Sequence, residues 1–136
     1  MEMKINNTDA QILGVKMGKN FLNAIGASAP LKPLVENKAS NQHGKSVFRP
    51  NIPYLDERDV TLYFNIEGAS ESDFLAKKKA FEQILYKGLV TIYIPANNET
   101  YRLTYQKCQE YAQNTRRTFC KMCVKFNEAN PNNRSN

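Results

Sequence analysis

The sequence predicts an α+β fold that is mainly antiparallel β, a β-sandwich or barrel with one flanking α-helix over residues 70–87. The first observation is a set of runs in which apolar and polar residues alternate, as in strands with one buried face; they span residues 60–66, 89–94, 100–107 and 117–126. The second is a single amphipathic stretch between the first two runs. Strands and helices do not alternate along the chain, which argues against a doubly wound parallel sheet. The third is a long extended arm, residues 26–56, which lacks periodicity.

Length and composition set the broad class of protein. The 136 residues fit one domain, 1–136, and 41% hydrophobic residues can bury a modest core. The N-terminus has no apolar run of signal-peptide length, and no stretch approaches the roughly 18 apolar residues of a membrane span. We therefore expect a protein that is cytoplasmic at synthesis and has no membrane partner. Three cysteines, an odd number, favour reduced thiols over a disulfide framework.

The segment before the arm has a broken apolar pattern. An apolar patch indicates a strand near residues 11–16, although Gly14 inside it weakens that strand. A turn is expected at residues 18–20. A second short element follows it, and for this element a strand and a helix both remain open.

The arm, residues 26–56, has conflicting signals. It holds four of the six prolines, which argues against regular structure. Compact domains seldom carry about 30 residues without structure, and such loops are usually functional or disordered. Two interpretations remain: a floppy insertion, or an arm that becomes ordered on a neighbouring subunit. The arm has too many apolar residues for a pure linker. We expect the interface with a neighbour to contain Leu34, Val35, Phe48 and Tyr54.

Residues 70–87 carry the signals of a helix. Ser70 is a good N-cap, and Asp73, three residues later, gives a box-like start that satisfies free backbone N–H groups. A glycine follows the last turn, where helices commonly end. One narrow apolar stripe, at about 100° per residue, is formed by Phe74, Phe81 and Leu85.

The strand runs have two distinct faces, one apolar and one largely polar. A turn at residues 95–98 joins the second and third runs as a hairpin. Residues 109–115 are mostly polar and predict a loop, and residues 127–136 predict a flexible polar tail. Because one helix covers only one face of a sheet, the other face must meet a second sheet, a barrel closure or another subunit.

The sequence contains no visible catalytic constellation. Cys120 and Cys123 have C-x-x-C spacing, but residues three apart in a strand point to opposite faces, so we expect one core thiol and one on the other face. His43, the only histidine, lies in the arm without a nucleophile motif around it. The glycines form no phosphate-binding pattern. We therefore expect neither an enzyme nor a metal or cofactor site.

The net charge of +6 leaves nucleic acid as an alternative partner. Basic residues occur on the predicted helix and near the end of the chain: Lys77, Lys78, Lys79, Arg116, Arg117, Lys121 and Lys125. Strand tyrosines could stack on bases between them. Such lysines more often form a solvated helix face, however, and such tyrosines are more often half-buried. A basic nucleic-acid-binding module is therefore the second hypothesis, with nucleic acid not the primary partner.

Four segments carry a resemblance to a known family. They are Asp56-Glu-Arg-Asp-Val-Thr-Leu-Tyr-Phe-Asn-Ile-Glu-Gly68, the helix with its apolar stripe, Tyr101-Arg-Leu-Thr-Tyr105, and Val124-Lys-Phe-Asn-Glu128 with Asn130-Pro131. Together they resemble a family of small tail proteins of phages and prophages. The layout is similar to the N-terminal domain of siphophage distal tail proteins and to tail-tube proteins.

The resemblance implies a β-sandwich or barrel that assembles into rings, commonly hexameric, with other tail proteins as further partners. It also implies extended loops that reach a neighbouring subunit, and a place in a virion or tail-like particle. None of the matched motifs is catalytic. A distal tail protein usually carries a further C-terminal domain, whereas this chain ends at Asn136, which favours a tube-like or minimal tail component.

Overall fold

The structure is a computed structural model that describes residues 1–33, 35–37, 46–48 and 54–135. Its elements, in chain order, are β1 (Lys4–Ile5), β2 (Thr8–Asp9), β3 (Val15–Met17), α1 (Phe21–Gly26), β4 (Val35–Asn37), β5 (Ser46–Phe48), β6 (Arg58–Glu67), α2 (Glu71–Tyr86), β7 (Leu89–Ile94), β8 (Glu99–Gln113) and β9 (Phe119–Glu128).

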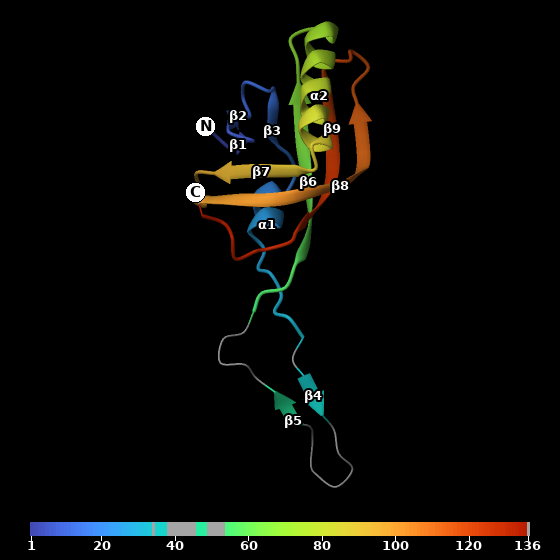
Figure 1. The fold of residues 1–136 in the computed structure, drawn as a ribbon. Coiled ribbons are helices and arrows are strands. Elements are labelled where there is room, and N and C mark those ends of the chain that lie inside the picture. The colour runs from blue at the N-terminus through green and yellow to red at the C-terminus, as the bar shows by residue number, and fades with distance from the viewer. Residues whose placement is uncertain (34, 38–45, 49–53, 136) are drawn as a thin grey trace.

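Among the described residues, seven strands form one antiparallel sheet in the order β2-β1-β7-β8-β9-β6-β3. The sheet curls into a half-barrel because β8 changes partner along its length: residues 99–104 pair with β7, and later residues pair with β9. In Figure 1, β7 and the start of β8 run across the long strands β6 and β9, and α2 lies along those long strands. The predicted α+β fold, mainly antiparallel β with a flanking helix, is confirmed.

The core lies between the curled sheet and the two helices. Phe64 of β6 is buried at its centre, with ring centroids 5.3 Å from Phe21 of α1 and 5.0 Å from Phe81 of α2. Phe126 of β9 completes this aromatic group at 6.2 Å from Phe64. Edge and tilted contacts of this kind add to the free energy that burial of the rings already contributes. One side chain on β6 therefore joins both helices to the sheet.

Helix α2 begins and ends where its residues predict. The Asp73 N–H donates to Ser70 Oγ at 3.2 Å, and the Ala69 N–H donates to Asp73 Oδ2 at 2.8 Å, so two free donors at the helix start are satisfied. At the other end Gly88 has φ 91°, a left-handed conformation that glycine adopts without steric cost. The predicted apolar stripe of Phe74, Phe81 and Leu85 is buried.

The N-terminal segment adds short strands at both edges of the sheet. β1 pairs with β7 and β3 pairs with β6, so the segment before α1 bridges the two outer strands of the long meander. β1 and β2 are too short to give a periodic signal and were not expected. β3 spans Val15–Met17 and is displaced from the predicted residues 11–16, because Gly14 has φ 72° and turns the chain. The short element after the turn, for which the sequence allowed a strand or a helix, is the helix α1.

The prediction of a loop at residues 109–115 is wrong for residues 109–113, because β8 continues to Gln113. All side chains from Gln106 to Gln113 are exposed, so no buried face imposes alternation on the sequence. Backbone pairing with β9 forms this part of the strand instead.

The C-terminal residues also differ from the expectation of a flexible tail. β9 includes Asn127 and Glu128, and Glu128 is fully buried. Beyond the strand, the Thr100 N–H donates to the Arg134 carbonyl oxygen at 3.0 Å, and the Arg102 guanidinium donates to the Asn133 carbonyl oxygen at 3.2 Å. The described tail therefore runs back along the start of β8 and is hydrogen-bonded to it.

Candidate assembly interface

The arm is a hairpin that leaves the body between α1 and β6. Its described strands β4 and β5 pair antiparallel, with Val35 directly opposite Phe48. Nearer the body, the Lys32 N–H donates to the Tyr54 carbonyl oxygen at 2.9 Å. Figure 1 shows this hairpin beyond the sheet, away from the core. The expectation of no regular structure in residues 26–56 is wrong for β4 and β5, because an antiparallel ladder pairs backbone groups without any periodic apolar pattern.

The four residues predicted for the interface fall in different places. Val35 and Phe48 are opposed in the β4–β5 register, which puts the two positions on one face of the hairpin. Tyr54 lies at the arm root, the residues 27–33 and 54–58 that join the hairpin to the body, and is 66% exposed. Leu34 lies outside the described residues.

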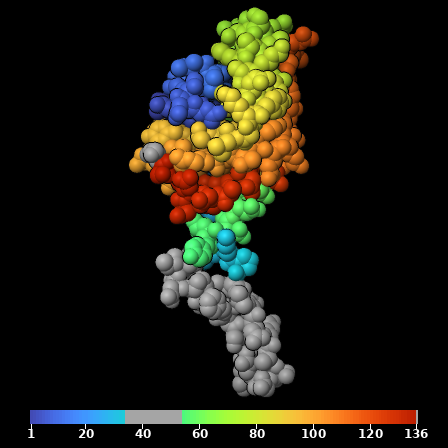
Figure 2. Space-filling model, in the orientation of Figure 1, coloured from blue at the N-terminus to red at the C-terminus, as the bar shows by residue number. Residues whose placement is uncertain are grey.

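The arm root exposes apolar surface. Leu31 and Leu55 form an antiparallel bridge, and both side chains are exposed together with Tyr54. In the space-filling view of Figure 2 the body narrows to the cyan and green residues of this root. Exposed apolar residues that lie together often mark an interaction site.

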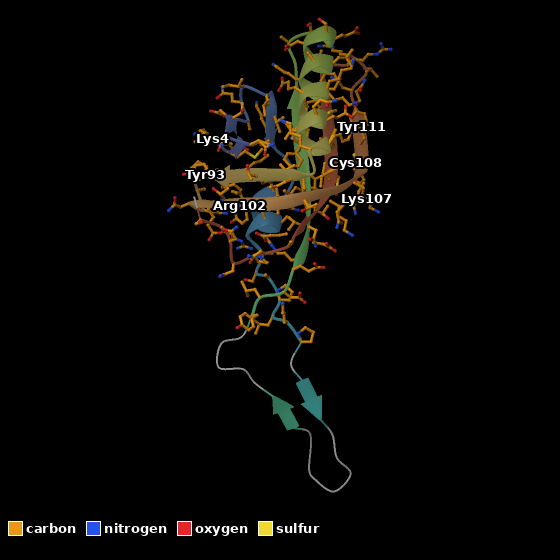
Figure 3. All side chains as sticks on the ribbon, viewed as in Figure 1. Lys4, Tyr93, Arg102, Lys107, Cys108 and Tyr111 are labelled. Carbon is orange, nitrogen blue, oxygen red and sulfur yellow. The ribbon has the colours of Figure 1, made fainter. Side chains whose placement is uncertain are left out.

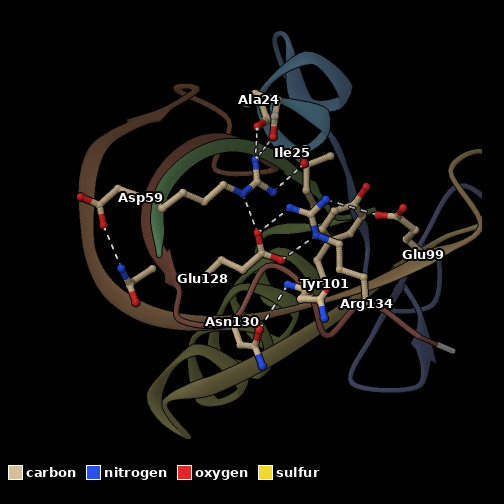
Figure 4. A network of polar contacts seen from close by, with 12 residues as sticks. Ala24, Ile25, Asp59, Glu99, Tyr101, Glu128, Asn130 and Arg134 are labelled. Carbon is tan, nitrogen blue, oxygen red and sulfur yellow. Dashed lines mark hydrogen bonds and ion pairs between the residues drawn. The ribbon is translucent and has the colours of Figure 1, made fainter. Parts of the chain in front are cut away.

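A buried arginine holds the arm root to the body. Arg58, the first residue of β6, donates to the carbonyl oxygens of Ala27 at 2.6 Å and Ile25 at 2.7 Å, both at the end of α1. Its Nε donates to Glu128 Oε1 at 2.5 Å (Figure 4). Arg58 therefore connects the point where the arm leaves the body with the point where it returns.

Glu128 is the acidic centre of this group. It is fully buried and accepts hydrogen bonds from Arg58 and from Arg134, whose Nη2 lies 2.9 Å from Oε1. Burial alone would raise the pKa of Glu128, but the hydrogen bonds and charges of Arg134 and Arg58 outweigh burial, and the pKa is lowered. Arg134 also pairs with Glu99 at 3.5 Å, so the group extends to the start of β8.

This lowered pKa predicts a pH dependence of stability. Because the folded pKa of Glu128 lies below its ordinary value of 4.5, its contribution is present above that pH and is lost as the pH falls through the folded pKa. We expect the free energy of unfolding to fall on acidification below about pH 4.5, and Glu128→Gln to flatten part of that fall. Urea unfolding of both proteins between neutral and acidic pH measures this. Identical pH profiles would contradict it. Asp73, whose pKa is also lowered, titrates equally in both proteins.

Sequence reasoning missed Arg58 and Glu128, although a signal was present. Arg58 shares the inward positions of β6 with Val60 and Leu62, and Glu128 shares those of β9 with Phe126. The two charged residues are direct partners in the β6–β9 register. Opposite charges at inward positions of two neighbouring strands predict a buried ion pair, since an unpaired buried charge is strongly unfavourable.

The C-x-x-C cysteines lie on opposite faces of β9, as predicted. Cys120 belongs to the core cluster, whereas the Cys123 thiol lies 3.8 Å from Gln109 Oε1 on the other face. Burial raises the pKa of both thiols. The described part of the chain contains no group of three or more His, Cys, Asp or Glu side chains that could hold a metal ion. His43 lies outside the described residues.

Two of the three helix lysines are ion-paired within α2. Lys77 Nζ lies 3.1 Å from Asp73 Oδ2, and Lys78 Nζ lies 3.3 Å from Glu82 Oε1. Both are i,i+4 pairs of the kind found on solvated helix faces. Part of the positive charge considered for nucleic-acid binding is thus balanced by neighbouring carboxylates.

A search of solved structures finds a fold like this one. The crystal structure of the Dit protein of phage SPP1, described as a paradigm of the hub adsorption apparatus in phages that infect Gram-positive bacteria, matches with a TM-score of 0.64 and 13% sequence identity. The match covers 96% of this chain and 50% of that chain, so this chain spans about half the length of the phage protein. At this identity the likeness is one of fold.

No family model matches the sequence, and no curated protein matches it. Within the described ranges, neither helix is long and apolar enough to cross a membrane.

Proposed function

We propose that this chain is a structural component of a phage or prophage tail, which self-assembles into a ring or tube and carries out no catalysis. The observation that carries the proposal is the likeness of fold to a phage tail hub protein over nearly the whole chain. The arm supports it independently, because a projecting hairpin with exposed apolar residues at its root offers surface to a neighbour.

The principal partner in this proposal is a second copy of the chain, in a ring such as a hexamer, and further tail proteins bind the assembled ring. The protein is made in the cytoplasm and resides in a virion or tail-like particle. Its working residues are interface residues of the arm: Leu34, Val35, Phe48 and Tyr54. They bind a neighbour by strand addition or by apolar docking.

The buried polar group around Glu128 fixes the arm root to the body, which favours one direction of the arm. Arg58 bonds the end of α1 and Glu128 at once, so the two legs of the arm root are joined to β9. A hairpin held at its root loses less conformational entropy on binding than a free loop, because part of its ordering has already occurred on folding.

Deletion of residues 32–49 tests this function. We expect the wild-type protein to form larger species with rising concentration in light scattering, and the deletion protein to remain a folded monomer, because the core of the described residues is built from residues 3–25 and 60–126. Circular dichroism and a thermal melt check that the deletion protein folds. Assembly of the deletion protein at the wild-type concentration would contradict the role of the arm. A wild-type protein that stays monomeric at every concentration would count against self-assembly.

A matched pair of point variants tests whether assembly depends on the arm or on the protein surface in general. Phe48→Asp places a charge in β5, and Ile12→Asp places the same charge at a position of the N-terminal segment that is 73% exposed. We expect only the first to reduce assembly.

A further inference from the structure

The second half of β8 has an unpaired backbone edge. The ladder with β7 ends at Thr104, and the Tyr105 N–H donates to the Gly88 carbonyl oxygen at 2.8 Å on that side. On the other side, pairing with β9 continues to Gln113. Within the described ranges, no strand pairs with the outer edge of residues 106–113. Natural proteins usually shorten, charge or cover such an edge, because it can accept a strand from another chain.

Part of this edge is protected and part is not. Register shifts between Tyr105 and Lys107 and between Cys108 and Glu110 disrupt the first half, where Lys107 also carries a charge. From Glu110 to Gln113 the register with β9 is regular. Figure 3 shows Lys107, Cys108 and Tyr111 on this outer strand. The open regular edge is therefore four residues long, close to the three-residue strands β4 and β5.

A small hollow lies beside the open edge, between β8 and α2. It has a volume of about 170 Å³, and its lining combines Leu85, Tyr86, Tyr105, Tyr111 and Met122 with the polar side chains of Lys78, Glu82 and Cys108. The Tyr86 side chain is 61% exposed and the Tyr111 side chain 42%. A hollow next to an open edge can take an alternate side chain of an added strand, while the backbone supplies the hydrogen bonds.

The arm of the same molecule lies at the far end of the sheet. The register pairs Gln113 with Cys120 and Cys120 with Ile66, so the open edge lies at the Ile66 end of β6. The arm joins the opposite end of β6, at Arg58. At about 3.3 Å per residue, these eight residues separate the two ends of β6 by roughly 26 Å. The β4–β5 hairpin also projects away from the sheet (Figure 1), so a contact between the open edge and an arm is a contact between two molecules.

We propose that the open edge of β8, residues 110–113, binds the β4–β5 hairpin of a second copy of this chain by strand addition. This proposal rests on the proposed function and names its receiving surface. Because the arm and the edge are different surfaces at opposite ends of one molecule, the contact is head-to-tail, and head-to-tail contacts generate rings or open filaments. Pairing of two β8 edges with each other would instead give a two-fold dimer.

Cysteine cross-linking tests the contact, because Cys108 is exposed beside the edge whereas Cys120 and Cys123 are buried. The Phe48→Cys/Cys108→Ser protein, which carries its introduced thiol on the arm, is mixed with wild-type protein and treated with a short thiol–thiol cross-linker. We expect a band of two-chain mass in which mass spectrometry joins residue 48 to Cys108. We expect the band to disappear when both proteins carry Cys108→Ser. Val35→Cys, opposite Phe48 in the hairpin, is the second arm probe, and Ile12→Cys in the exposed N-terminal segment is the control site.

Light scattering on the same samples separates the possible results. If the protein assembles but neither arm cysteine joins Cys108, the receiving edge is wrong and the proposed function stands. If Cys108 is cross-linked only to Cys108 of another copy, the open edge binds a second β8 edge. That result would overturn the proposal that the edge binds the arm. If no assembly occurs at any concentration, both the contact and the proposed function are overturned.

Discussion

Replacement of Glu128 by leucine is expected to lower the free energy of unfolding by about 3–5 kcal/mol. The substitution leaves the buried Arg58 without its carboxylate, and removal of one partner from a buried pair leaves an uncompensated charge. Arg134 loses its closest acceptor too, although it keeps Glu99 at 3.5 Å. Urea unfolding at neutral pH measures the loss.

Two further variants identify the origin of that loss. Asp59→Asn removes an exposed pair with Lys125 and is expected to change the free energy of unfolding by less than about 1 kcal/mol. The double variant Arg58→Met/Glu128→Leu removes both charges and is expected to recover part of the stability. A double variant less stable than Glu128→Leu alone would show that Arg58 contributes mainly through its bonds to α1.

The elements that the sequence predicts well are those whose signals are local. α2 is found because its cap at Ser70 and its buried stripe lie within one stretch of chain. β6 and β7 are found because each buries one face, so alternation of apolar residues appears directly in the sequence. Local signals of this kind need no knowledge of the partner strand.

The elements that the sequence misses depend on partners distant in the chain. Residues 106–113 form a strand through backbone pairing with β9, and their exposed side chains carry no alternation. Arg58 and Glu128 are 70 residues apart, so strand alternation places each at an inward position, but only the β6–β9 register shows that they form a pair. The tail is held by contacts with the start of β8 that a polar sequence does not reveal.

The arm is an intermediate case. Its apolar content and prolines mark residues 26–56 as an unusual segment. The arm root, with the exposed Tyr54, lies inside this segment. Its strands β4 and β5 could not be predicted, since three paired residues are too few for a pattern. The surface that receives the arm depends on how β8 curls away from β7, which no local signal encodes.

Replacement of Phe64 by alanine is expected to lower the free energy of unfolding by about 3–5 kcal/mol, because the cavity adjoins several elements that cannot all collapse into it. The Phe64 ring lies 5.3 Å from Phe21, 5.0 Å from Phe81 and 6.2 Å from Phe126. Each contact joins β6 to a different element. Thermal and urea unfolding of the variant measure the loss.

The same experiment separates folding from assembly. Phe64 is buried, whereas Leu75 is exposed on α2, so Leu75→Ala should change the free energy of unfolding by no more than about 0.5 kcal/mol. At temperatures where the Phe64→Ala protein is still folded, it should assemble as the wild type does, since the arm root and the open edge of β8 are exposed. A loss of less than about 1 kcal/mol would contradict the placement of Phe64 at the centre of the core. Equal losses for Phe64→Ala and Leu75→Ala would contradict the distinction between the buried and exposed positions.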